Sequence, residues 1–259
     1  LDVKAAIPNA RKVETLFKER PEESKKTGES VKSVMPLELK EVRFGYTKAK
    51  EVLHGVNMCF EKGKKYAIVG SSGCGKSTLL KSIAKLTPYQ GEITYKDQNI
   101  QKIFPGKYYS KVGLIFQETN QQFLNVTVGE ELMLSIKNGH NPFLTSKTAK
   151  ELLAMVGLPD ISQRIIYSLS GGQRKLIQNL VMLIMGQEIL LMDEPFAGLD
   201  HKSLQKLLTL IEQSKQHFPQ TLLIVSHQLD HLASVVDYHL SLTNQQLSYQ
   251  GGQQNESQH

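Results

Sequence analysis

Apolar and polar positions alternate along the part of the chain that follows Pro36. The alternation covers Leu37–Phe44 and returns over Val56–Phe60, where it ends in the turn Glu61–Gly63. A period of two is typical of strands that bury one face. Because the connections between these segments are short, the pattern predicts antiparallel strands.

Four other segments are apolar at nearly every position and have the length of a strand. They are Tyr66–Val69, Val112–Phe116, Ile189–Met192 and Leu222–Val225. Such runs are typical of strands that are covered on both faces, as in a parallel sheet. The sequence therefore predicts a buried parallel sheet in addition to the antiparallel strands.

Helical periodicity follows the first apolar run and dominates the middle of the chain. Ser146 is the predicted N-cap of one helix, and Gly157 is its predicted stop. We expect another helix to begin just after Gly172 and another to cover Ser203–His217. The residues expected on the buried faces of these helices are Leu79, Leu80, Ile83, Leu86, Leu152, Leu153, Val156, Leu176, Leu180 and Leu183.

The pattern divides the chain into an extension, one domain and a tail. Residues 1–35 combine a weak helical pattern with a charged linker, which fits either a frayed arm or a tether from a preceding domain. The start at Leu1 favours a processed or excised piece. We predict one domain over 36–251, with a helical subdomain over roughly residues 118–186, and a disordered polar tail over 252–259.

Composition narrows the class of protein only slightly. With 40% hydrophobic and 22% charged residues, the 259-residue chain is ordinary for a soluble globular protein. It has no apolar run of about eighteen residues, so we predict no membrane span. Cys59 and Cys74 predict no structural disulfide and fit a reducing cytosol. The net charge of +6 is interspersed, which fits contact with nucleotides or an acidic membrane surface better than a nucleic-acid partner.

A glycine-rich loop follows the first apolar run directly. Its glycines let backbone N–H groups turn toward phosphates, and the helix expected after it adds the positive end of its dipole. We expect Lys76 to reach the β- and γ-phosphates and the Ser77 hydroxyl to bind Mg²⁺. The residues predicted to bind the nucleotide are Gly70, Ser71, Ser72, Gly73, Cys74, Gly75, Lys76, Ser77 and Thr78.

Two acidic residues end the third apolar run. Asp193 stands where a carboxylate can hold Mg²⁺, through water. Glu194 follows at the strand tip and is the candidate general base for the water that attacks the γ-phosphate. The motif Leu169-Ser-Gly-Gly-Gln173 precedes this strand by one predicted helix, so Ser170, Gly171, Gly172 and Gln173 can form a second phosphate cap at a helix N-terminus.

These three motifs, in this order, resemble the nucleotide-binding domain of ABC transporters over about Pro36–Gly251. The resemblance implies an α/β fold with a P-loop NTPase core of mainly parallel sheet flanked by helices, an antiparallel β subdomain and an α-helical subdomain. It also implies roles for further residues. Tyr46 matches the aromatic residue that stacks on adenine. Gln117 matches the glutamine that contacts Mg²⁺ and the attacking water. His227 matches the histidine that contacts the γ-phosphate. The segment Ala197–Asp200 matches the loop that communicates across the dimer.

The resemblance further implies an ATPase that uses ATP and Mg²⁺ and works as a pair. Two such domains, identical or different, close head to tail on two ATP molecules, each held between Gly70–Thr78 of one domain and Ser170–Gln173 of the other. Closure on ATP is a shift toward the state in which ATP contacts both halves. A transmembrane subunit or domain then converts the cycle into transport, which places the chain at the cytoplasmic face of the cell membrane, either peripheral or tethered.

Import and export both stay open from the sequence. Gln117–Phe123 and Glu194–Asp200 are similar to importer ATPases, especially the energy-coupling-factor group, and we favour that interpretation. The N-terminal extension is instead similar to the segment that leads out of the last membrane helix of fused exporters. The substrate is not specified by these residues.

Two other functions are weighed against transport. ATPase heads that act on nucleic acid carry a long coiled coil between the positions of Gln117 and Ser170, and no sustained heptads occur there. A cassette that binds ATP but hydrolyses it poorly would not be expected to retain the four residues Lys76, Gln117, Glu194 and His227. One departure from the family stands after Gln173, where Arg174–Leu180 replaces a second Arg and small residues and is expected to alter helix packing.

Overall fold

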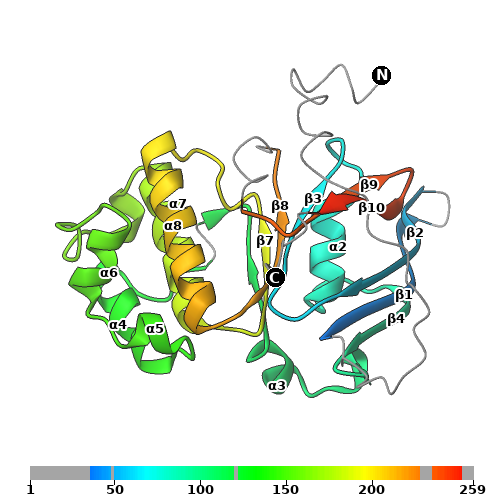
Figure 1. The fold of residues 1–259 in the computed structure, drawn as a ribbon, viewed down its shortest axis with the longest axis horizontal. Helices are drawn as coiled ribbons and strands as arrows, with labels where there is room; N and C mark the ends of the chain where they lie inside the picture. The colour runs from blue at the N-terminus through cyan, green and yellow to red at the C-terminus, as the bar shows by residue number, and fades with distance from the viewer. Residues whose placement is uncertain (1–35, 48–49, 120–121, 228–234, 253–259) are drawn as a thin grey trace, which may run out of the picture. The chain divides into compact units, whose positions relative to one another are not determined.

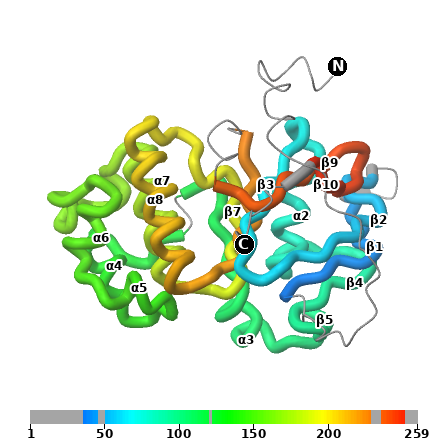
Figure 2. The backbone as a smooth tube through the Cα atoms, in the orientation of Figure 1, coloured from blue at the N-terminus to red at the C-terminus, as the bar shows by residue number. Residues whose placement is uncertain are grey.

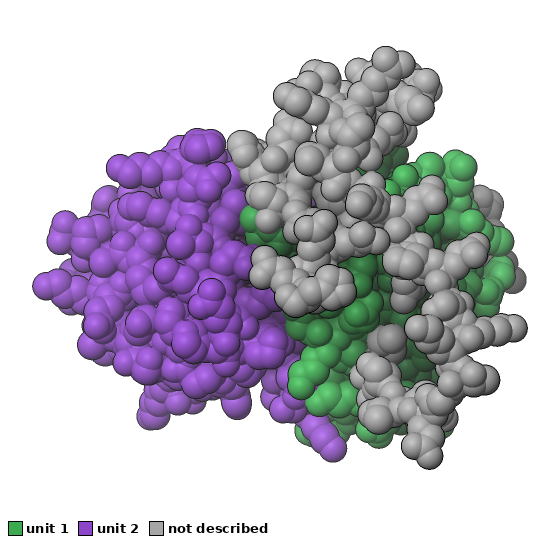
Figure 3. Space-filling model, viewed as in Figure 1, with its two compact units in different colours: residues 1–104, 229–259 green, residues 105–228 purple. Residues whose placement is uncertain are grey.

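A computed structural model describes residues 36–47, 50–119, 122–227 and 235–252, apart from the side chains of 46, 47, 50, 251 and 252. The chain forms two compact units (Figure 3). Unit 1 comprises residues 1–104 and 229–259, and unit 2 comprises residues 105–228. The predicted N-terminal extension, residues 1–35, lies outside the described residues.

An antiparallel sheet in the order β2–β1–β4–β5 forms one part of unit 1 (Figures 1 and 2). Its strands are β1 (Leu37–Thr47), β2 (Lys50–Phe60), β4 (Gln90–Tyr95) and β5 (Gln98–Asn99). Leu37 of β1 pairs with Phe60 of β2 on one side and with Tyr95 of β4 on the other. The antiparallel pairing predicted for the first two strands is therefore confirmed.

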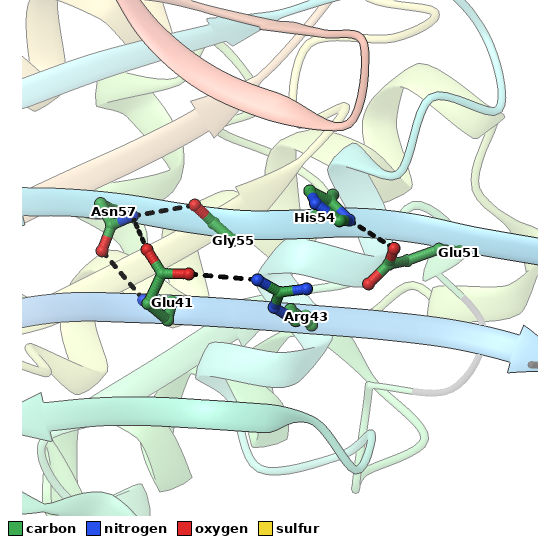
Figure 4. Close-up of polar contacts among 6 residues, drawn as sticks. All are labelled: Glu41, Arg43, Glu51, His54, Gly55 and Asn57. Carbon is green, nitrogen blue, oxygen red and sulfur yellow. Dashed lines mark hydrogen bonds and ion pairs between the residues drawn. The ribbon is translucent and has the colours of Figure 1, made fainter.

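A polar cluster covers an irregularity in the pairing of β1 with β2 (Figure 4). Glu41 has a φ of 50°, a left-handed conformation that is uncommon for a residue with a side chain. Asn57 brackets it, because its Nδ2 donates to Glu41 Oε1 at 2.6 Å and its Oδ1 accepts from the Glu41 N–H at 2.9 Å. The hydrogen bonds from Asn57 and then Arg43 hold the pKa of Glu41 below its ordinary value. The bulge explains why the apolar alternation shifts by one position between Leu39 and Val42.

The other strands of unit 1 are β3, β9 and β10. Strand β3 (Lys65–Val69) runs parallel to β9 (Tyr238–Thr243), and β9 is antiparallel to β10 (Gln246–Gly252). Tyr66 of β3 is fully buried and stacks on Tyr238 of β9 with ring centroids 5.0 Å apart. Strand β3 was predicted, whereas β9 and β10 were not, and β10 extends through residue 252, the first of the predicted polar tail.

Helix α2 (Lys76–Ile83) leaves the glycine-rich loop and completes the core of unit 1. Leu79, Leu80 and Ile83 are buried on it, as predicted. The prediction for Leu86 is wrong, since Leu86 lies beyond the helix and is 50% exposed. The helix ends before it because Lys85 takes a left-handed φ of 60°.

Unit 2 contains three parallel strands side by side in the order β6–β7–β8 within the described residues. They are β6 (Val112–Ile115), β7 (Ile189–Asp193) and β8 (Thr221–Val225). Every residue of the three strands is buried. The three apolar runs predicted as buried parallel strands are therefore confirmed, with Phe116 falling just past the end of β6.

Helices supply the rest of unit 2, and α7 and α8 run beside each other in Figure 1. Leu176, Leu180 and Leu183 of α7 are buried, as predicted. Short 3₁₀ turns occupy Ile100–Lys102 of unit 1 and Ile166–Ser168 of unit 2. The helices of unit 2 are α3 (Pro105–Tyr109), α4 (Val128–Asn138), α5 (Pro142–Thr145), α6 (Ala149–Met155), α7 (Gly171–Met185) and α8 (His201–His217).

The start of α6 corrects one sequence prediction. Ser146, the predicted N-cap, instead follows the end of α5 and donates its hydroxyl to the Phe143 carbonyl. Thr148 is the N-cap, and it forms a reciprocal capping box with Glu151. The predicted stop is confirmed, because Gly157 follows the helix with a φ of 80°.

Helix α8 begins at His201, two residues before its predicted start at Ser203, because the Asp200 side chain accepts a hydrogen bond from the Ser203 N–H and caps it.

No helix in the described part of the chain is both long enough and apolar enough to cross a lipid bilayer.

Candidate nucleotide site

The glycine-rich loop of unit 1 connects the buried strand β3 to the N-terminus of α2. Lys76 is the first residue of α2 and is only 6% exposed. Its ammonium donates to the carbonyls of Gly70 at 2.8 Å and Ser71 at 2.9 Å. The loop is thus wrapped around its own lysine, with the Cys74 sulfur 4.0 Å from Nζ.

Gly75 shows why glycine is needed where the loop enters the helix. It is the N-cap of α2 with a φ of 109°, and a Cβ atom there would lie 2.6 Å from Val52 Cγ1. As a glycine, Gly75 has no side chain with which to cap this end of α2. The first N–H groups of a helix carry partial positive charge and lack partners inside the helix, so the geometry fits a bound phosphate group.

The carboxyl ends of β6, β7 and β8 gather the predicted hydrolytic residues of unit 2. Gln117 follows β6, Asp193 ends β7 with Glu194 next to it, and His227 follows β8. Because the three strands are parallel neighbours, these residues stand at one edge of the sheet. Asp193 is 5% exposed, whereas the side chain of Gln117 is exposed.

The structure brings Glu194 and His227 together. The main-chain N–H of His227 donates to Glu194 Oε2 at 3.3 Å, and Nε2 of His227 lies 3.3 Å from Glu194 Oε1. Glu194 has a φ of 48°, a left-handed conformation that turns it out of the line of β7. Its side chain is 12% exposed, and the His227 nitrogen is within ion-pair distance of the buried Oε1. A carboxylate held beside an imidazole can accept a proton from water.

The motif Leu169–Gln173, called the signature motif from here on, leads into the N-terminus of α7 and caps that helix. Ser170 Oγ accepts from the Gln173 N–H at 3.2 Å, and Gln173 Oε1 accepts from the Ser170 N–H at 3.2 Å. The Ser-x-x-Gln spacing of this capping box is readable in the sequence but was not recognised there. Ser170 and Gly171 are exposed, so the end of this helix can face a ligand.

Gly172 lies against the loop that was expected to communicate across the dimer. A Cβ atom on Gly172 would stand 2.8 Å from the Gly198 carbonyl oxygen. The loop therefore packs so closely on the signature helix that only glycine fits. Asp200, at the end of the same loop, caps α8.

Sequence analysis missed three buried polar residues on α7, namely Lys175, Gln178 and Asn179. Lys175 Nζ donates to the carbonyls of Phe116 at 3.2 Å and Gln117 at 2.8 Å. Burial lowers the pKa of Lys175 from its ordinary value, while the charges of Asp193 and Glu194 act in the opposite direction. The departure from the family pattern over Arg174–Leu180 was the available signal.

The other predicted residues of the glycine-rich loop lie at the start of α2 or just before it. Gly73 lies in the loop, Ser77 lies in the first turn of α2, and Thr78 is buried in that turn. Tyr46 belongs to β1, but its side chain lies outside the described residues, so its predicted role with adenine is untested. The loop after Gln117 is described except for residues 120 and 121.

A strand that enters a glycine-rich loop and a helix, together with acidic residues at the tip of a buried parallel strand, defines a P-loop nucleotide triphosphatase. The chain belongs to the ABC transporter family, whose model matches residues 53–197. It binds and hydrolyses ATP to power transport across a membrane, as the ATP-binding proteins of this family do.

Similar proteins agree with this assignment. The chain is 38% identical over 194 residues to the thiamine import ATP-binding protein ThiQ of Haemophilus influenzae, covering 74% of this chain and 89% of that protein. It is 34% identical to the energy-coupling factor transporter ATP-binding protein EcfA2 of Staphylococcus aureus, covering 72% of this chain and 68% of that protein. The structure of CbiO1 from Clostridium perfringens, part of an ABC transporter complex, matches with a TM-score of 0.69 at 25% identity, covering 84% and 88% of the two chains. These proteins support transport and give no support to the nucleic-acid alternative.

Proposed function

We propose that this chain is the ATPase of a membrane importer, in which two cassettes close on ATP at the cytoplasmic face of the membrane. The similarity to ATP-binding proteins named for thiamine import and for an energy-coupling factor transporter supports this direction. Residues 36–251 would form the cassette, with the helical subdomain over roughly residues 118–186. Substrate choice would lie with the membrane partner.

The observation that carries the hydrolytic part of the proposal is the pairing of Glu194 with His227. Glu194 would polarise the attacking water through its carboxylate, which lies beside the His227 imidazole. His227, 58% exposed and 3.3 Å away, would both orient this carboxylate and reach the γ-phosphate. The Glu194 carboxylate would then take the proton from this water, with the His227 imidazole beside it.

ATP and Mg²⁺ fit the residues that are present. The N-terminus of α2 and the main chain of Gly70–Thr78 offer N–H donors to phosphates, and we assign to the same phosphates Lys76, whose ammonium donates to the Gly70 and Ser71 carbonyls in this structure. The Ser77 hydroxyl, the buried Asp193 carboxylate and the Gln117 amide are the oxygen ligands that Mg²⁺ prefers, and we assign them to it. Mg²⁺, when bound with ATP, supplies charge neutralisation at the transferred phosphoryl group. Tyr46 is assigned to adenine.

The second cassette, identical or different, would supply its Ser170–Gln173 to the ATP held by Gly70–Thr78 of the first. The exposed N-terminus of α7 supports this assignment, because a helix of fifteen residues presents its positive end there. The fit of Gly172 against Gly198 would let the communicating loop sense whether the signature motif is engaged.

The membrane partner would dock on an apolar surface of unit 2. Leu124 and Val126 are 82% and 60% exposed, and Ile165 and Tyr167 are each 51% exposed. The two segments lie side by side, because Thr127 and Ile165 form an antiparallel bridge. The buried Glu131 carboxylate accepts from the main chain of Leu124 and so holds the first segment in place. We propose that a helix of the transmembrane subunit binds this surface, since the ATPase of a transporter must contact its transmembrane subunit.

The test combines turnover and molecular size for Glu194→Gln. We expect the variant to lose ATPase activity by about a hundredfold or more, as removal of a general base implies. We also expect it to form a dimer with Mg²⁺-ATP, seen by light scattering, because the closed state can no longer be reopened by hydrolysis. Glu212→Gln on the exposed face of α8 is the matched control and should behave as the wild type.

Two outcomes would contradict the proposal at different points. If Glu194→Gln keeps wild-type turnover, Glu194 is not the base. If the variant is inactive yet remains monomeric with ATP, two copies of this chain do not form the closed pair, and a different cassette must complete it.

A further inference from the structure

A buried polar stripe runs along α7 just after the signature motif. Lys175, Gln178 and Asn179 stand at positions i, i+3 and i+4 and therefore share one face of the helix. Their exposed fractions are 4%, 0% and 0%. Charged and amide side chains are seldom buried to this extent unless they form hydrogen bonds to buried partners.

Lys175 holds the chain where it leaves β6. Its ammonium donates to two successive carbonyls, Phe116 at 3.2 Å and Gln117 at 2.8 Å. A cation that bonds two neighbouring carbonyls restrains both peptide planes at once. The direction of the Gln117 side chain depends on those planes, because Gln117 lies between them.

Gln178 adds a second attachment one turn further along α7. Its Nε2 donates to the Phe116 carbonyl at 3.1 Å and to Gln122 Oε1 at 2.6 Å. Gln122 in turn donates from Nε2 to the Leu114 carbonyl at 3.0 Å. The segment that follows β6, from Phe116 to Gln122, is called the glutamine loop here. Its first residues and Gln122 are thereby fixed to α7.

Asn179 extends the contact to the acidic strand tip. Its Nδ2 donates at 2.8 Å to the carbonyl of Pro195, the residue after Glu194. The bonds from Lys175, Gln178 and Asn179 thus join α7 to the two segments that carry Gln117 and Glu194.

We propose that Lys175 is a positioning residue for ATP hydrolysis, which clamps the glutamine loop to the signature helix so that Gln117 and Ser170 shift as one body. This rests on the proposed role of Gln117. Its consequence is that engagement of the signature motif by a second cassette is transmitted mechanically to Gln117 through the two carbonyls.

The test is Lys175→Met, which keeps the length and burial of the side chain and removes the donors. Amide hydrogen exchange of a peptide covering residues 112–119 should become faster in the nucleotide-free variant. We expect kcat for ATP to fall by about ten- to a hundredfold, as a small misplacement of an orienting group implies, with KM changed less than threefold. Lys137→Met, which removes an exposed lysine of α4, is the matched control and should change neither quantity.

A second variant keeps the proposal testable if Lys175→Met fails to fold. Gln178→Met retains Lys175 and removes only the attachment to Phe116 and Gln122. It should speed exchange in the same peptide and lower kcat by a smaller factor. Combined with Lys175→Met, it should lower kcat by less than the product of the two single effects, because both act on one loop.

The results separate the clamp from the proposed function. Unchanged exchange over residues 112–119 in both variants would overturn the clamp, whatever the activity. Faster exchange with unchanged kcat would overturn the positioning role while leaving Gln117 in its proposed place. Absence of ATPase activity in the wild type would instead refute the proposed function, and the exchange measurement would still decide whether the clamp exists.

Discussion

At the scale of single residues, the site depends on a glutamate whose backbone has an unusual conformation. Glu194 occupies a left-handed conformation that a glutamate adopts only when its surroundings require it, at a cost of about 1–3 kcal/mol. This conformation turns the Glu194 carboxylate toward His227 rather than along β7. Strain of this kind is a feature of functional sites more often than of scaffolding.

Cys74 gives a prediction at the same scale. Its sulfur lies 4.0 Å from the Lys76 ammonium, and the side chain is partly exposed. We expect N-ethylmaleimide to abolish ATPase activity, because the adduct would occupy the loop beside Lys76, and we expect bound ATP to protect. Activity and mass should be followed together.

The background for this measurement is Cys59→Ser, which leaves Cys74 as the sole thiol of the sequence. Cys74→Ser in the same background should be insensitive to the reagent. Full labelling of Cys74 without loss of activity would refute the expectation.

At the scale of elements, helix starts in unit 2 are fixed by reciprocal caps. Helices α4, α6 and α7 each begin with a capping box, at Thr127, Thr148 and Ser170. The box sets where each helix begins and hence which residues face inward. For α7 the same arrangement also decides where the signature motif presents its N–H groups.

The start of α6 supplies a prediction with an internal control. Thr148→Ala should lower the free energy of unfolding by about 1 kcal/mol, because the Thr148 hydroxyl accepts from the Glu151 N–H. Ser146→Ala should lower it clearly less, since Ser146 caps no helix N-terminus. Denaturant unfolding of both variants measures the difference, and equal losses would contradict the assignment of the cap.

The sequence predicted the elements whose burial is uniform. Tyr66–Val69 and Ile189–Met192 are apolar throughout, so a strand with both faces covered was the natural interpretation, and the structure has it. Strand β9 was missed because His239 and Ser241 interrupt any continuous apolar run, and of its residues only Leu240 and Leu242 are buried. Helix α3 was missed because it spans only Pro105–Tyr109 and shows no full period.

The site was predictable in its motifs but not in its contacts. The loop around Lys76 and the strand tip at Glu194 are local patterns that a sequence states directly. The burial of Lys175 could not be predicted, because it depends on where the Phe116 and Gln117 carbonyls lie in the folded chain. The pairing of Glu194 with His227 depends in the same way on the register of β7 with β8.

At the scale of the whole molecule, the chain is a cassette that gains its function by contact with others. The apolar surface at Leu124, Val126, Ile165 and Tyr167 makes this testable. Leu124→Ser together with Tyr167→Ser should reduce the fraction of the chain that sediments with membranes of its native cells. The loss of one buried anchor worth about 2 kcal/mol corresponds to roughly thirtyfold weaker binding.

Phe104→Ser is the control for this measurement, because Phe104 is 76% exposed and belongs to unit 1. It should leave sedimentation unchanged, and both proteins should bind ATP as the wild type does. Equal sedimentation of the double variant and the wild type would place the membrane partner on another surface.

The Gln122 side chain also affects the tendency of the protein to aggregate at high concentration. Among the described residues, strand β6 ends the strand order of its sheet, and its outer main-chain groups would otherwise be open to a strand from another copy. The Gln122 amide occupies two of them, donating to the Leu114 carbonyl and accepting from the Phe116 N–H. One side chain therefore imitates a neighbouring strand and protects this border of the sheet from edge-to-edge aggregation.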